Sequence, residues 1–199
     1  MEKFILRYID FNKCYSYVLL NAFVWILSVA LVATKSIPQK PIQTALHVIG
    51  FCLMVYIYLG FVKYSILQKK DTFRKLIFIA MVFSVTQSSI AITATLVDNI
   101  QLYNYNGIPV AIEAILLQYA FRAIQNEKII YFRKLARIYL YLSIFYVPGS
   151  LDLLFGDKTP LHPYLIKPIV ILVPFLAALI VYALYLKMRA FKQISTQMY

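Results

Sequence analysis

The feature that most constrains the fold is a series of apolar blocks of about 20 residues, separated by short charged segments. A helix of that length crosses the hydrocarbon core of a bilayer, which is about 30 Å thick. The chain is 62% hydrophobic and 14% charged, whereas a soluble domain is roughly 45–50% apolar and about 25% charged. We therefore predict an all-α, polytopic transmembrane helical bundle that forms one integral membrane domain over residues 1–199.

About six blocks meet the hydropathy criterion for a membrane helix. The predicted spans lie near 15–34, 44–66, 76–97, 108–124, 135–155 and 164–186. The fourth block is the shortest and contains Glu113, Gln118 and Arg122. A re-entrant segment that does not fully cross the bilayer is therefore an alternative for that block.

The Lys and Arg residues alternate with the predicted spans, as the positive-inside rule requires. Sixteen of the 20 lie in the N-terminal segment, the second and fourth connections and the C-terminal segment. This predicts that both ends of the chain are cytoplasmic, in a multi-pass protein of a cell membrane, with the bacterial cytoplasmic membrane as the preferred location. The net charge of +12 does not indicate direct nucleic-acid binding, because the cations lie between apolar blocks and not on one soluble face.

Polar residues are concentrated in the third block. At about 100° per residue, one side of this helix carries Ser84, Gln87, Ser88, Thr95 and Asp98. The opposite side carries Thr86, Ser89 and Thr93. We expect this helix at the centre of the bundle, where its polar groups serve either helix packing or a polar pathway.

Glu113 is the acidic residue that lies clearly within a predicted span, and an ionisable group at that depth is a candidate functional residue. The topology also brings His47, Asp98 and Lys167 near the outer membrane face. Together with Gln87, Ser84, Ser88 and Thr95, these residues are candidates for a ligand or ion pathway. The alternatives are that Glu113 joins helices and that the others are ordinary interfacial residues.

No pattern of catalytic or metal-binding residues accompanies these groups. His47 and His162 differ in depth, so they do not suit a shared haem or metal, and Cys14 and Cys52 show no ligand spacing. GxSxG and HExxH are not present. We assign no catalytic residue, metal or cofactor, and the chain is more consistent with a non-enzyme than with an enzyme.

The two basic cytoplasmic connections are candidate docking surfaces for anionic lipid headgroups or for a protein partner. Their cations are Lys69, Lys70, Arg74 and Lys75 in the second connection and Arg133, Lys134 and Arg137 in the fourth. Topology alone is the other explanation for these charges.

The leading functional hypothesis is a non-enzymatic membrane subunit of a bacterial membrane complex, such as a sensor, scaffold or defence-type component. It would act as a homo-oligomer or bind a soluble cytoplasmic partner through the basic loops. One alternative is a transporter or channel that uses the polar third helix and Glu113. Another is an intramembrane lipid-modifying enzyme.

The charge distribution predicts the sidedness of single cysteines in a variant without Cys14 and Cys52. Lys69→Cys and Lys134→Cys should react with an impermeant maleimide only after the cytoplasmic face is opened. Asn106→Cys and Lys158→Cys should react in intact cells. Labelling of position 134 in intact cells would contradict the topology.

Overall fold

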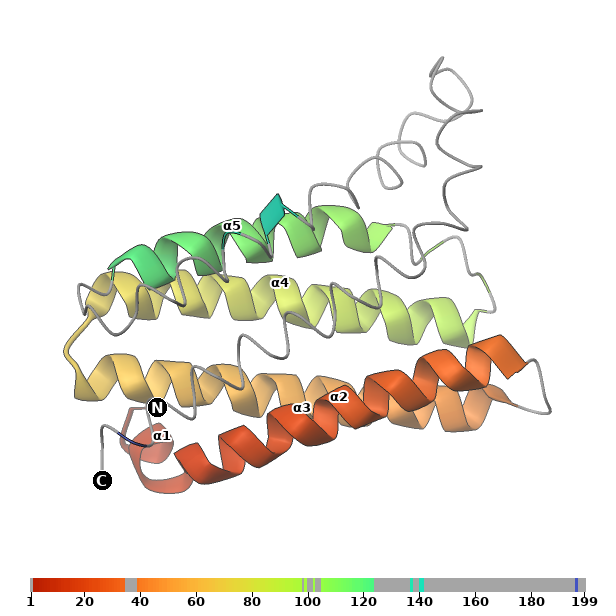
Figure 1. The fold of residues 1–199 in the computed structure, drawn as a ribbon, viewed down its shortest axis with the longest axis horizontal. Helices are drawn as coiled ribbons and strands as arrows, with labels where there is room; N and C mark the ends of the chain where they lie inside the picture. The colour runs from red at the N-terminus through yellow and green to blue at the C-terminus, as the bar shows by residue number, and fades with distance from the viewer. Residues whose placement is uncertain are drawn as a thin grey trace, which may run out of the picture.

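The structure, a computed structural model, describes residues 2–34, 39–97 and 105–123, with the single residues 99, 102, 137, 140, 141 and 196. Five helices occur in these residues: α1 (Glu2–Tyr8), α2 (Phe11–Thr34), α3 (Gln39–Leu67), α4 (Asp71–Leu96) and α5 (Gly107–Ala123) (Figure 1). No strand occurs among the described residues. The all-α prediction is therefore confirmed for this part of the chain.

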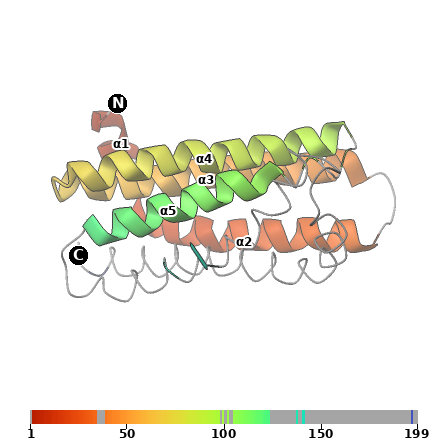
Figure 2. The same ribbon diagram turned by 90° about the horizontal axis from the view of Figure 1, so that it is seen from above.

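The four long helices run side by side, and α1 lies across them near one end (Figures 1 and 2). Helix α3 packs against α2 and α4, and α4 also packs against α5. Helix α1 packs against α3. An ion pair between Glu2 and Arg74 places α1 at the end of the bundle where α4 begins.

Among the described residues, two helical segments are long and apolar enough to cross a membrane: Lys40–Leu67, with a mean hydropathy of 2.1, and Asp71–Leu96, with 1.9. Two such helices are by themselves a weak indication of membrane association. Large apolar side chains are also exposed on all five helices, with exposed fractions of 62% for Phe23 of α2, 49% for Val82 of α4 and 40% for Ile115 of α5 among them. Extensive exposed apolar surface of this kind is typical of a surface that meets lipid or another protein.

Helices α2 to α5 coincide within a few residues with the first four predicted spans. Helix α5 is continuous over 17 residues, about 25 Å at the rise of an α-helix. Whether it crosses a bilayer completely stays a prediction, as do the six-span topology and its orientation. The predicted spans 135–155 and 164–186 lie outside the described residues, apart from residues 137, 140 and 141.

The polar residues of α4 lie in two environments. Three of them are buried in the bundle: Ser84, Ser88 and Thr95. Three on the opposite side are exposed: Thr86, Ser89 and Thr93. The hydroxyls of Thr86 and Ser89 each donate to the backbone carbonyl four residues earlier, at 3.0 Å. Each hydroxyl therefore has a hydrogen-bond partner within its own helix, whatever surrounds that side of α4. The central position of this helix stays a prediction, because the spans 135–155 and 164–186 lie almost entirely outside the described residues.

The turn between α3 and α4 closes with two hydrogen bonds. The Lys70 N–H donates to the Ser65 carbonyl at 2.9 Å, and the Lys69 N–H donates to the Ile66 carbonyl at 3.1 Å. This pair of bonds is a Schellman motif, in which the residue after the helix adopts a left-handed conformation and is usually glycine. Here Lys69 occupies that position, with φ 51°.

Small residues allow the central helices to approach closely. Ala80 of α4 and Ala114 and Ala120 of α5 are fully buried. Near the α3–α4 turn, rings of Phe61, Tyr64, Phe73 and Phe121 form a buried aromatic cluster with centroids 5.9 to 6.0 Å apart. Edge-to-face contacts at this spacing add to the stabilisation from burial alone.

This packing predicts that Ala114→Leu destabilises the bundle by about 1–3 kcal/mol, because there is no space for the added atoms. The check is the melting temperature of the detergent-solubilised protein. Ile115→Leu, at the neighbouring 40%-exposed position, is the matched control and should leave the melting temperature unchanged. Equal melting temperatures for the two variants would contradict the observed α4–α5 interface.

Candidate functional site

The carboxyl group of Glu113 joins three helices. Its Oε1 accepts a hydrogen bond from the Tyr58 hydroxyl of α3, and its Oε2 accepts one from the Gln87 amide of α4 at 2.8 Å. Glu113 is 2% exposed and Tyr58 is fully buried. A buried carboxyl without partners costs several kcal/mol, so these bonds offset much of the cost of placing Glu113 inside the bundle.

Local packing explains how the three side chains meet. Glu113 lies on the buried face of α5 with Val110, Ala114 and Leu117. Because Ala114 is small, α5 approaches the other helices closely enough for the carboxyl of its neighbour to reach Tyr58 and Gln87. We call Tyr58, Gln87 and Glu113 the carboxyl cluster.

The carboxyl cluster lies deeper in the bundle than the sequence suggested. Depths counted from the predicted helix ends match Glu113 with Thr93, Lys167 and His47 on other helices. The structure gives Glu113 a bond to Gln87, which is nine residues before the last residue of α4, or about 14 Å along the helix. Thr93 instead lies on the exposed side of α4.

Other predicted pathway residues bond within their own helix. The Ser88 hydroxyl donates to the Ser84 carbonyl at 3.2 Å, and the Thr95 hydroxyl donates to the Ala91 carbonyl at 3.0 Å. Ser84, Ser88 and Thr95 are thus on the same buried face as predicted, but two of the three hydroxyls are used locally. Asp98 and Lys167 lie outside the described residues.

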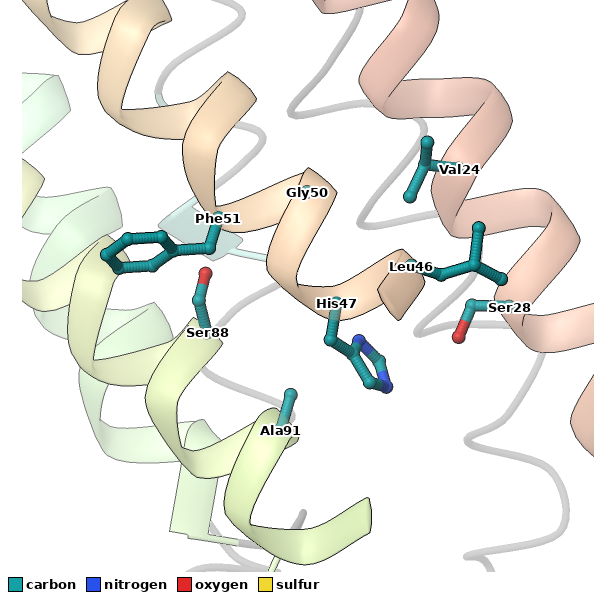
Figure 3. Close-up of a pocket in the computed structure, with 8 residues that line it drawn as sticks. All are labelled: Val24, Ser28, Leu46, His47, Gly50, Phe51, Ser88 and Ala91. Atoms are coloured by element: carbon teal, nitrogen blue, oxygen red, sulfur yellow. The ribbon is translucent and has the colours of Figure 1, made fainter. Parts of the chain in front are cut away.

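His47 and Ser88 belong to a second polar location, a small cavity between α2, α3 and α4 (Figure 3). Its polar lining comes from Ser28, His47 and Ser88, which are 4%, 6% and 9% exposed. The cavity measures about 10 Å³, which is close to the minimum needed for one water molecule. We call this space the histidine cavity.

Asn21 of α2 lies next to the histidine cavity and has no hydrogen-bond partner for either amide atom, although it is fully buried. A Cβ atom added to Gly50, which lines the cavity, would lie 3.4 Å from the Asn21 Oδ1. Position 50 of α3 and the Asn21 amide of α2 are therefore close neighbours. The cost of an unpartnered buried amide marks this region as unusual within the bundle.

The predicted docking cations differ in their availability. Lys69, Lys70 and Lys75 are exposed, whereas Arg74 forms ion pairs with Glu2 and with Asp71, the latter at 2.8 Å. In the fourth connection Arg137 is exposed. Arg133 and Lys134 lie outside the described residues.

Tyr58 and Asn21 are the site residues that sequence reasoning missed. Tyr58 is one of several tyrosines in an apolar block, and only the three-dimensional arrangement shows that its hydroxyl reaches a buried carboxyl. Asn21 is flanked by apolar residues and had no polar neighbour in sequence to signal a site.

Among the described residues, no group of three or more His, Cys, Asp or Glu side chains is placed to hold a metal ion. Compared with models of protein families, with curated proteins and with solved structures, the chain matches none. The functional interpretation therefore depends on the geometry of the bundle itself.

The carboxyl cluster makes a quantitative prediction. Glu113→Ala should destabilise the solubilised protein by about 1–3 kcal/mol, because the Tyr58 hydroxyl and the Gln87 amide lose a buried partner. Glu113→Gln should cost much less, because an amide of the same shape can bond both groups after Gln87 turns its own amide. Chemical unfolding in mild detergent measures both.

A double-mutant cycle provides the control. Tyr58→Phe removes the same hydrogen bond by deleting its donor. The losses of unfolding free energy in Tyr58→Phe and in Glu113→Ala should therefore sum to more than the loss in the double variant. Strictly additive effects would contradict a direct bond between the two side chains.

Proposed function

We propose that this chain is a non-enzymatic integral membrane subunit of a bacterial membrane complex, with six spans and both ends in the cytoplasm. Its role is that of a scaffold or sensor component that binds an acidic soluble protein at the α3–α4 turn. The binding surface consists of three exposed lysines, two in the turn and one near the start of α4: Lys69, Lys70 and Lys75.

The observation that carries the proposal is the backbone of Lys69. A side chain in the left-handed region costs about 1 kcal/mol relative to glycine, and Lys69 adopts φ 51° at the C-terminal cap of α3. The chain thus places an exposed cation where glycine would favour folding. Residues that keep an unfavourable backbone conformation are concentrated at functional sites.

The carboxyl cluster supports a fixed bundle more than a conducting one. Both oxygens of Glu113 are bonded by side chains of the same bundle, Tyr58 and Gln87. A polar network satisfied in this way makes a core rigid and specific. It joins α3 to α5 at Tyr58, nine residues before the last residue of α3, or about 14 Å from the start of the turn along the helix.

A transporter or channel is the second candidate, and the histidine cavity with the unpartnered Asn21 is the observation that favours it. A transport function requires a flux in proteoliposomes that is lost in His47→Leu. At about 10 Å³, the cavity has room for one water molecule and not for a larger substrate. The geometry therefore supports the subunit function better.

The proposal predicts opposite effects of Lys69→Gly on stability and on binding. The variant should stabilise the protein by about 0.5–1 kcal/mol, because glycine adopts this left-handed conformation without steric strain. It should also weaken cross-linking in cells from a photoreactive amino acid at position 70 to an acidic soluble protein. Thermal unfolding and the yield of the cross-linked product are the two measurements.

Lys40, an exposed lysine at the opposite end of α3, provides the matched control. A photoreactive group at position 40 should give no such product, and Lys40→Gln should not change the yield from position 70. Cross-links from position 70 only to lipid, or only to a second copy of this chain, would contradict the proposed partner.

A further inference from the structure

We infer that α1 is an interfacial helix that binds the anionic lipid headgroups of the cytoplasmic leaflet, with Phe4 and Tyr8 inserted below Lys3 and Arg7. This inference depends on the proposed membrane placement of the long helices. It concerns a surface separate from the lysines of the α3–α4 turn.

Helix α1 is fixed to the bundle at several points. Ile5 and Ile9 are each 3% exposed and belong to the buried core. The Tyr56 hydroxyl donates to the Tyr8 carbonyl at 3.3 Å and accepts from the Asp10 N–H at 3.1 Å. The helix is therefore a constant part of the bundle, and it lies across the long helices (Figure 2). A helix across the bundle axis lies along the plane of a bilayer that the bundle spans.

The orientation of α1 follows from its ion pair. Glu2 contacts Arg74, in the first turn of α4, and so faces the end of the bundle. At about 100° per residue, Phe4 lies on the side of α1 opposite Glu2. Phe4 therefore faces back along the bundle, towards the level of the apolar side chains exposed on α2, Leu19 and Phe23 among them.

The exposed surface of α1 has the composition of an interfacial helix. Phe4 and Tyr8 are 58% and 55% exposed, and their ring centroids are 4.8 Å apart. Lys3 and Arg7 are exposed one residue before each ring, and the Arg7 guanidinium lies 5.4 Å from the centre of the Tyr8 ring. Aromatic rings at the acyl boundary with cations beside them are what a surface-bound helix presents to anionic lipid.

This placement also sets the height of the α3–α4 turn. Tyr56 and Lys63 of α3 donate to the carbonyls of Tyr8 and Ile9 at the proposed lipid surface, at 3.3 and 2.5 Å. Lys63 precedes Leu67, the last residue of α3, by four residues, or about 6 Å along the helix. The turn then lies on the cytoplasmic side of α1. Lys69 and Lys70 are thus placed for a soluble protein, while Lys3 and Arg7 are placed for lipid.

Fluorescence quenching in reconstituted vesicles tests the depth. In a Trp25→Phe background, Phe4→Trp should be quenched by lipids brominated near the headgroup and little by aqueous iodide. Phe23→Trp, in the middle of α2, should be quenched by lipids brominated deeper in the chains. Leu6→Trp, on the side of α1 away from Phe4, should be more sensitive to iodide than Phe4→Trp.

The outcomes separate the inference from the membrane placement. Strong iodide quenching of Phe4→Trp with lipid quenching of Phe23→Trp would overturn the interfacial role of α1 alone. Failure of lipid quenching at both positions would overturn the membrane placement as well. Lipid quenching of Phe4→Trp with the shallow bromines supports the inference.

Energy transfer tests the charge preference. Transfer from Phe4→Trp to dansyl-labelled phosphatidylglycerol should exceed transfer to dansyl-labelled phosphatidylcholine several-fold in mixed vesicles. Combining Lys3→Gln with Arg7→Gln should remove this preference, and Lys40→Gln should leave it unchanged. Equal transfer to the two lipids before neutralisation would overturn the proposed binding of anionic headgroups.

Discussion

The Glu113 carboxyl and its two bonds, to Tyr58 and Gln87, determine how the central helices of this bundle fit together. Apolar packing between helices in lipid has little preference for one register over another, because lipid tails are as apolar as leucine. A buried carboxyl removes that freedom, since a shift of either partner helix by one turn would leave it unpartnered in an apolar setting. The close approach at Ala80 and Ala114 then follows from the register that the carboxyl requires.

Outside this centre, one end of the bundle carries two different surfaces. Three exposed lysines lie in the α3–α4 turn, which a Schellman cap closes, and near the start of α4, and α1 lies across α3 with its aromatic rings exposed. Arg74, between them, is used internally to hold Glu2. That ion pair is partly exposed, so its contribution to stability is small, and its importance is in orienting α1. In the proposed placement, α1 is a lipid-facing anchor next to the basic turn, which is the arrangement expected of a subunit that presents a partner at a fixed height above the membrane.

The positions of α2 to α5 were predictable from the sequence because long apolar blocks and the charges between them depend on local composition alone. The identity of Glu113 as the distinctive residue was predictable for the same reason, since a carboxylate among apolar residues needs a partner. Its partners were not predictable. Depth estimates counted from predicted helix ends placed Glu113 beside Thr93 and His47, whereas the packing of α5 brings it to Gln87 and Tyr58. The orientation of α1 likewise depends on one contact, Glu2 with Arg74, between segments far apart in the chain.

The hydrogen bonds of Glu113 are most directly tested by infrared difference spectroscopy of the protein in bilayers, with Glu113→Gln used to identify the band of this carboxyl group. If Tyr58 and Gln87 both bond the carboxyl, Tyr58→Phe and Gln87→Leu should each shift the frequency of that band, because each removes one donor. Ser89→Ala, on the exposed side of α4, should leave the frequency of the carboxyl band unchanged. A carboxyl band that neither Tyr58→Phe nor Gln87→Leu alters would contradict the carboxyl cluster as the interaction that joins α3, α4 and α5.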